Sequence, residues 1–210
     1  MYILYYSPGA ASLLVHWMLI ETDAPHTLVK VDTAGGEHKR PEYLAMNPNG
    51  VIPTLLIDGR PHYEAAALAM HLADAFPQSG LAPAHDDPLR MSYLQWMFNL
   101  ANMVQPLLRA WWYPGEPAGE ANADAVREQL QTRLATQWDR IDAHLASHGP
   151  FLLGASPSTP DFFLSMLMRW SRNTPRNPLQ WPHLRALAEA LVARPSFATL
   201  YAREGLTEWP

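Results

Sequence analysis

Hydrophobic and polar positions change their spacing along the first 80 residues. The runs MYILYYS and HTLVKVDT are rich in aromatic and β-branched residues, which is typical of strands, and the apolar run between them has the length of a helix. After the turn NPNG, the stretches VIPTLLIDG and RPHYE predict a hairpin joined at Asp58 and Gly59. The predicted elements are a strand at 1–7, a helix at 12–22, a strand at 26–33, a short helix at 41–46, strands at 51–59 and 60–64, and a helix at 65–76. This order is βαβ followed by ββα, with the first two strands parallel.

The rest of the chain has helical spacing only. Helices are predicted at 89–112 and 121–147, from Ser158 onward, at 181–193 and at 196–204. Ser158 is a good N-cap, and Asp161 three residues later predicts a capping box with Asp in place of Glu. The stretch 76–88 is dense in Pro, Gly and small polar residues. We therefore predict a first domain at 1–78, a linker at 79–87 and an all-helical domain at 88–210.

Composition narrows the classes of function. With 48% hydrophobic residues in a 210-residue chain there is enough apolar material for a buried core, and a net charge of -5 without a long basic run argues against nucleic-acid binding. No apolar stretch approaches the roughly 20 residues that cross a bilayer, and the N-terminus lacks secretory features. The absence of cysteine fits a reducing compartment. The sequence predicts a cytoplasmic protein without membrane or nucleic-acid partners and, from scattered histidines, without a metal site.

The stretch YYSPGAAS joins the first strand to the first helix. A tight turn at this location carries the Cys-x-x-Cys pair of a thioredoxin-like domain, because a helix start lowers the pKa of a thiol. In this chain the four turn residues are Ser7, Pro8, Gly9 and Ala10. The turn therefore has the location of a thiol site but no sulfur.

Four segments, in this order and spacing, resemble the cytosolic glutathione transferases: YYSPGAAS, NPNGVIPTLLIDG, EAAALAMHLAD and STPDFFL. The bacterial beta class resembles the chain most, through its YYxPGxxS opening and the EGL sequence at 204–206. The resemblance covers essentially the whole chain and implies an α/β thioredoxin-like N-terminal domain (βαβ-ββα), an all-α C-terminal domain and a homodimer. It also implies a detoxification enzyme that conjugates the thiolate of glutathione, a co-substrate rather than a covalently bound cofactor, to small hydrophobic electrophiles.

The resemblance places the glutathione contacts at Ala11, His38, Ile52, Pro53, Glu64 and Ala65. It implies a cis bond before Pro53, which turns the backbone of Ile52 outward to pair with the cysteinyl part of glutathione like an added strand. A plain edge-strand proline is the alternative. Relatives usually have Ser at the position of Ala65. Loss of that hydroxyl, worth roughly 1.5 to 3 kcal/mol, predicts glutathione binding weakened about tenfold or more.

Three hydroxyls are candidates for donating to the glutathione sulfur, in the order Tyr6, Ser12 and Ser7. Ala10 falls where the serine-dependent classes have their catalytic serine, and Ala11 falls at the characteristic cysteine of the beta class. Tyr6 has the position of the catalytic residue in the tyrosine-dependent classes. The alternative is a core aromatic residue, since Tyr2, Leu4 and Tyr6 share one strand face.

The second domain is expected to supply the electrophile pocket, from Asn99, Asn102, Gln105 and Trp112. The three amides recur at helical spacing, and the indole offers a flat apolar surface. Gln105 falls at or near a histidine that beta-class members often place facing the thiol. Ordinary surface amides, and a tryptophan used in core or dimer packing, are the alternatives.

Two functions remain open. The first is a glutathione transferase, and the second is a catalytically weak or inactive glutathione-transferase-like binding protein. Replacements at Ala10, Ala11, Ala65 and Gln105 favour the second. A disulfide reductase is excluded because thiol exchange by the protein needs a protein thiolate.

Overall fold

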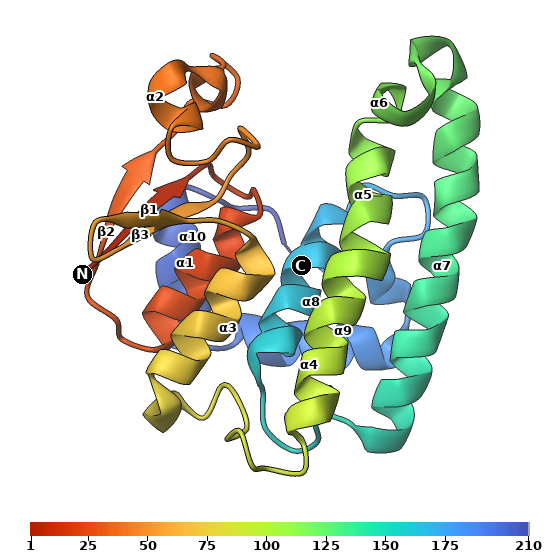
Figure 1. Cartoon of the computed structure of the whole chain (residues 1–210). Coiled ribbons are helices and arrows are strands. Elements are labelled where there is room, and N and C mark those ends of the chain that lie inside the picture. Colours follow the sequence, from red (N-terminus) through yellow and green to blue (C-terminus); the bar gives the residue numbers. More distant parts are fainter. Residues whose placement is uncertain (210) are drawn as a thin grey trace. The chain divides into compact units, whose positions relative to one another are not determined.

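The computed structural model describes residues 1–209, which group into two compact units (Figure 1). The first unit contains Met1–Ala84 together with Arg194–Glu208, and the second contains His85–Ala193. The first unit is therefore made from both ends of the chain. The domain boundaries drawn from the sequence stay predictions.

A four-stranded mixed sheet is the framework of the first unit. Its strands, in the spatial order β2-β1-β3-β4, are β2 (His26–Lys30), β1 (Tyr2–Tyr6), β3 (Thr54–Ile57) and β4 (Arg60–His62). β1 is parallel to β2 and antiparallel to β3, and β3 is antiparallel to β4. Pro61 lies in β4 at the edge of the sheet, where its missing N–H costs no ladder bond.

The helices of the first unit are α1 (Ser12–Glu21), α2 (Pro41–Leu44), α3 (Ala65–Ala75) and α10 (Pro195–Glu204), with single 3₁₀ turns at Glu37–Lys39 and Pro77–Ser79. α1 packs against β1, α3 and α10, so its residues from Ser12 to Leu19 are all buried. A helix enclosed on several sides has no solvent face, which explains why SLLVHWMLIE is apolar nearly throughout. The predicted α/β thioredoxin-like fold is confirmed.

The second unit is helical, as predicted. Its helices are α4 (Arg90–Asn99), α5 (Gln105–Trp112), α6 (Gly115–Ala118), α7 (Ala123–His148), α8 (Thr159–Trp170) and α9 (Pro182–Val192), with 3₁₀ turns at Glu120–Asn122 and Pro178–Gln180. The stretch predicted as one helix at 89–112 is interrupted by a π-helical segment, Leu100–Val104. Pro106 lies two residues after this segment, and because proline donates no N–H and crowds the carbonyl one turn earlier, the wider turn relieves that conflict.

The predicted capping box at the start of α8 is present. The Ser158 N–H and Oγ both donate to Asp161 Oδ2, at 2.8 and 2.9 Å, and the Leu152 N–H donates to Asp161 Oδ1 at 2.7 Å. Burial raises the pKa of Asp161 to about 6, against the opposing effect of these hydrogen bonds. The box fixes the start of a helix that is buried from Thr159 to Arg169. Among residues 1–209, no helix has the length and apolarity that a bilayer crossing requires.

Candidate functional site

Two parallel strands bring two of the predicted glutathione-binding segments to one end of the sheet. Tyr6 in β1 lies opposite Lys30 in β2, so both strands end together. β1 continues into the turn Ser7–Ala11, and β2 continues into the loop that contains His38. The Ser7 and Thr33 hydroxyls lie 3.1 Å apart and join these two segments.

The antiparallel strands bring the other two segments to the same end. Tyr5 in β1 pairs with Thr54, the first residue of β3, so Ile52 precedes β3 beside the end of β1. β4 runs back toward this end, with His62 opposite Leu55, and α3 begins three residues later. All four predicted segments therefore leave the sheet at one end (Figure 1).

The turn after β1 is built around Gly9 and Ser12. Gly9 has φ +69°, in the left-handed region that glycine adopts without steric cost. Ser12 is fully buried, and its Oγ donates to the Ser7 carbonyl at 3.1 Å and accepts from the Ser7 N–H at 3.3 Å. To donate to another acceptor, the Ser12 hydroxyl must give up its bond to this carbonyl.

Tyr6 is a buried strand aromatic residue that retains its phenol proton. It is 9% exposed, and its ring centroid lies 6.0 Å from that of His16. Burial raises the pKa of Tyr6, and the Glu204 carboxylate raises it further. The phenol is thus a hydrogen-bond donor at neutral pH, and its catalytic role stays a prediction.

A buried glutamate near the C-terminus is bonded to the turn and to α1. Glu204 Oε2 accepts from the Gly9 N–H, and Glu204 Oε1 lies against His16 Nδ1, both at 2.8 Å. The His16 and Glu204 side chains are fully buried. Because a carboxylate oxygen only accepts, His16 Nδ1 carries the proton in this pair. Gly9, His16 and Glu204 form what we call the Glu204 cluster.

His26 next to this cluster is held as one neutral tautomer. Its Nδ1 lies 2.7 Å from the Ala24 carbonyl, and its Nε2 lies 3.1 Å from Arg203 Nη1. The carbonyl can only accept and the guanidinium can only donate, so Nδ1 is protonated and Nε2 is not. Burial lowers the pKa of His26, His16 and Arg203 lower it further, and the bond to Ala24 opposes them.

The loop before β3 has the backbone geometry that the resemblance implies. The Ile52–Pro53 peptide bond is cis. Pro53 is buried and Ile52 is half-buried. Within residues 1–209, the backbone N–H and carbonyl of Ile52 make no hydrogen bond, so both are available to a partner in extended conformation.

The other four predicted glutathione contacts are Glu64, Ala65, His38 and Ala11. Glu64 precedes α3 with φ +74°, an uncommon conformation for a residue with a side chain, and no described side chain caps the helix. Ala65 opens α3 and is buried. His38 is half-buried, and burial together with Lys39 lowers its pKa. Ala11 is buried next to Ser12.

The predicted electrophile residues all belong to the second unit. Asn99 ends α4, Asn102 lies in the π-helical segment, and Gln105 begins α5. Asn102 is exposed and the other two amides are half-exposed. Trp112 is 39% exposed, and its indole N–H donates to the Trp170 carbonyl at 3.0 Å. A π-helical segment at this point is of interest because such segments are frequent at functional sites.

Both halves of the chain match models of one family. Residues 11–75 match the model "Glutathione S-transferase, N-terminal domain", and residues 124–191 match "Glutathione S-transferase, C-terminal domain". BphK, a bacterial glutathione S-transferase solved as a ternary complex, is 31% identical over 97% of this chain and 100% of its own, with a TM-score of 0.86. The chain belongs to the glutathione S-transferase family.

Other solved glutathione S-transferases are similar over nearly the full length. A Sulfitobacter homologue with bound glutathione is 26% identical, with a TM-score of 0.88 over 99% of both chains. A beta-class glutathione S-transferase from Sphingomonas chungbukensis is 26% identical, with a TM-score of 0.85 over 98% of this chain and 100% of its own. The resemblance stated from the sequence motifs is confirmed.

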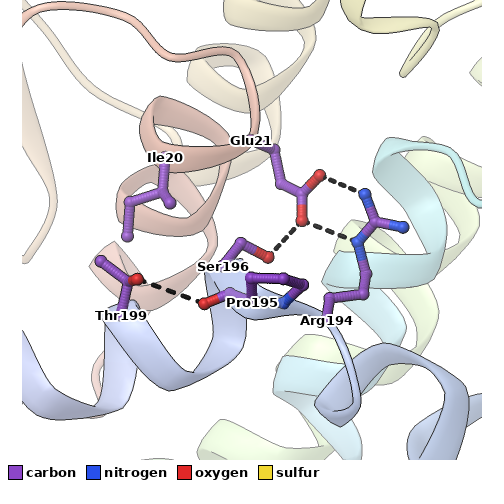
Figure 2. Close-up of a pocket in the computed structure, with 6 residues that line it drawn as sticks. All are labelled: Ile20, Glu21, Arg194, Pro195, Ser196 and Thr199. Carbon is purple, nitrogen blue, oxygen red and sulfur yellow. Dashed lines mark hydrogen bonds and ion pairs between the residues drawn. The ribbon is translucent and has the colours of Figure 1, made fainter.

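The glutathione S-transferase fold also contains a shallow pocket away from the predicted site. It is lined by Ile20, Glu21, Arg194, Pro195, Ser196 and Thr199, which lie near the C-terminal end of α1 and the N-terminal end of α10 (Figure 2). Glu21 accepts from Arg194 Nε and Nη2, at 2.8 and 2.5 Å, and from the Ser196 hydroxyl. These hydrogen bonds connect the end of α1 to the start of α10. We therefore assign them a structural role and do not propose a binding site in this pocket.

Sequence reasoning missed the role of the Glu204 cluster in this glutathione S-transferase. Among the sequence motifs Glu204 appears only as part of the EGL sequence, and no motif includes His16 as a site residue. The available signal was His16 itself, since a histidine in the middle of an apolar helix needs a polar partner when it is buried. Within the described residues, no three His, Cys, Asp or Glu side chains gather as metal ligands.

Proposed function

We propose that the protein binds glutathione at the end of the sheet where the four predicted segments meet. The observation that carries the proposal is the convergence of the turn after β1, the His38 loop, Ile52 and the start of α3 at that end. The free backbone groups of Ile52 suit the cysteinyl part of the tripeptide, and the start of α3 suits a carboxylate. A homologous structure contains bound glutathione, which supports the same ligand here.

The proposed activity is conjugation of glutathione to small hydrophobic electrophiles. A thiol with a pKa near 8.5 is only a few per cent ionised at pH 7, and lowering that pKa by two units requires about 2.7 kcal/mol of preference for the thiolate. One hydroxyl donor contributes roughly 1.5 to 3 kcal/mol, and a helix start about 0.3 to 1 kcal/mol. Tyr6 is the first candidate donor, followed by Ser12 and Ser7. In the reaction the thiolate sulfur forms a bond to carbon, and the leaving group departs with the bonding electrons.

We propose that Asn99, Asn102, Gln105 and Trp112 contact the electrophile. The amides can bind polar substituents, and the part-exposed indole offers an apolar face. Separate alanine substitutions are expected to raise KM for an aryl halide without changing the affinity for glutathione. Equal effects on both substrates would contradict this assignment.

Glutathione binding with little turnover is the second candidate function. It is favoured by the Ser12 hydroxyl, which is used inside the turn, and by Ala10 and Ala11, which offer no donor side chain. Retention on glutathione-agarose combined with a steady-state assay on an aryl halide separates the two functions. Retention with turnover supports the transferase, retention without turnover supports the binding protein, and no retention rejects both.

We also propose a homodimer that acts in the cytoplasm. Met91 and Phe98 of α4 are 71% and 58% exposed, and their seven-residue separation places them on one helix face. Large exposed apolar side chains on one face suit burial against a second copy. Sedimentation at micromolar concentration is expected to give twice the chain mass of 23.6 kDa, and the monomer mass would reject the dimer.

A further inference from the structure

The backbone carbonyl of Val51 faces inward although Val51 itself is exposed. The carbonyl oxygen accepts from the Tyr43 hydroxyl and from Asn47 Nδ2, both at 2.8 Å. Tyr43 is 5% exposed and Asn47 is fully buried, whereas Val51 is 37% exposed. Two buried side chains thus hold one backbone carbonyl of a surface loop.

The hydrogen bonds around these two donors fix the direction of each proton. The Tyr43 and Thr54 hydroxyls lie 2.8 Å apart, and since the single Tyr43 proton goes to Val51, Thr54 donates to Tyr43. Asn47 Oδ1 accepts from the Asn49 N–H at 3.2 Å, which leaves Nδ2 facing Val51. Burial raises the pKa of Tyr43, so its hydroxyl remains a donor at neutral pH.

The orientation of the Val51 carbonyl determines where Ile52 points. In a planar trans peptide the carbonyl and the following N–H point in opposite directions. When the Val51 carbonyl points toward Tyr43 and Asn47, the Ile52 N–H of the same peptide group points away from them. The two side chains therefore set the direction of a backbone group that no described residue uses.

We propose that Tyr43 and Asn47 are positioning residues for glutathione: by holding the Val51 carbonyl inward they present the Ile52 backbone to the cysteinyl part of the tripeptide. This inference rests on the proposed glutathione site and names two residues that do not touch the ligand. The loop then suits a ligand with an extended peptide backbone, because the free groups of Ile52 are one backbone N–H and one backbone carbonyl.

The test compares Tyr43→Phe with Thr22→Val by calorimetric titration with glutathione. Tyr43→Phe removes one of the two donors to Val51, and we expect its Kd for glutathione to rise roughly three- to tenfold. Thr22 directly follows α1, and its buried hydroxyl donates to the Met18 carbonyl at 2.7 Å, away from the loop. Its variant controls for the general effect of deleting a buried hydrogen bond and is expected to keep the wild-type Kd. The kcat at saturating glutathione is expected to remain unchanged in Tyr43→Phe.

A modified ligand separates positioning from a general loss of stability. A glutathione analogue with a methylene group in place of the cysteinyl carbonyl cannot accept a hydrogen bond from the Ile52 N–H, so the wild type should bind it more weakly than glutathione. If Tyr43 positions Ile52, the penalty for losing this carbonyl is smaller in Tyr43→Phe than in the wild type. A merely structural role would leave the two penalties equal, and that result would overturn the proposal.

The same titrations distinguish loss of the positioning role from the absence of a glutathione site. A wild type that does not bind glutathione rejects both. A wild type that binds, together with a Tyr43→Phe variant of unchanged Kd, rejects the positioning role alone. If Tyr43→Phe does not fold, Asn47→Ala removes the other donor to Val51, and the same two titrations decide.

Discussion

Glu204→Ala tests whether the Glu204 cluster stabilises the first unit. The substitution removes the acceptor for the Gly9 N–H and for His16 Nδ1 while leaving both donors in place. A buried donor without a partner costs about 1 to 3 kcal/mol. His16 is fully buried, so leaving its Nδ1–H without an acceptor is expected to cost about 1 to 3 kcal/mol. Gly9 is half-buried and water can reach its N–H, so the expected cost there is about 1 kcal/mol. We expect a loss of about 2 to 4 kcal/mol in the free energy of unfolding.

Urea unfolding, followed by intrinsic fluorescence and circular dichroism, measures this loss. In thermal unfolding of a chain of this size, each kcal/mol of lost stability lowers the melting temperature by about 2 to 4 °C. The melting temperature of Glu204→Ala should therefore fall by at least about 4 °C. Glu189→Ala is the matched control, because Glu189 is an exposed helical glutamate of α9. Glu204→Gln should lose less, since an amide oxygen can still accept from Gly9. Equal unfolding midpoints for Glu204→Ala and Glu189→Ala would refute the reasoning.

Three further predictions concern the thiol, the α3 start and the α8 cap. Titration of the bound glutathione thiol should give a pKa one to two units below about 8.5. Tyr6→Phe should raise this thiol pKa. A rise in Ser12→Ala but not in Tyr6→Phe would instead identify a serine-type site. Ala65→Ser should lower the Kd for glutathione about tenfold by restoring a hydroxyl at the start of α3, and calorimetry showing an unchanged Kd would mean that the hydroxyl does not reach the ligand. Because burial raises the folded-state pKa of Asp161 to about 6, its contribution to stability is present below the unfolded value and is lost as pH rises through 6. The unfolding free energy of the wild type minus that of Asp161→Asn should therefore fall by up to about 3 kcal/mol between pH 4 and 7, and a flat difference would contradict the raised pKa.

The elements of the fold follow from local signals in the sequence. The strands of the βαβ and ββα units, the helices after residue 89 except the short α6, and the capping box at Ser158 and Asp161 were predicted from spacing and capping residues. These features depend on neighbours within a few positions, which the sequence displays directly. The cis bond before Pro53 came from the resemblance and is confirmed.

The long-range parts of the site are not visible in local patterns. Nothing near Glu204 indicates that it pairs with Gly9, 195 residues earlier. The internal bond between Ser12 and the Ser7 backbone was missed, because the spacing shows a hydroxyl at a helix start but not which acceptor it uses. The π-helical segment at Leu100–Val104 also escaped prediction, because one widened turn leaves the apolar spacing of a long helix almost unchanged.

The position of α10 in the first unit has a consequence for synthesis on the ribosome. The turn after β1 is translated long before Glu204, its partner in the Glu204 cluster, because Gly9 and Glu204 are 195 residues apart and the second unit lies between them in the sequence. During synthesis α1 therefore lacks the cover of α10 until the whole second unit has been translated, and its apolar surface stays open to chaperones during that interval. A fragment that stops after α3 would lack this cover permanently, so the first unit is complete only when the segment after the second unit has been added.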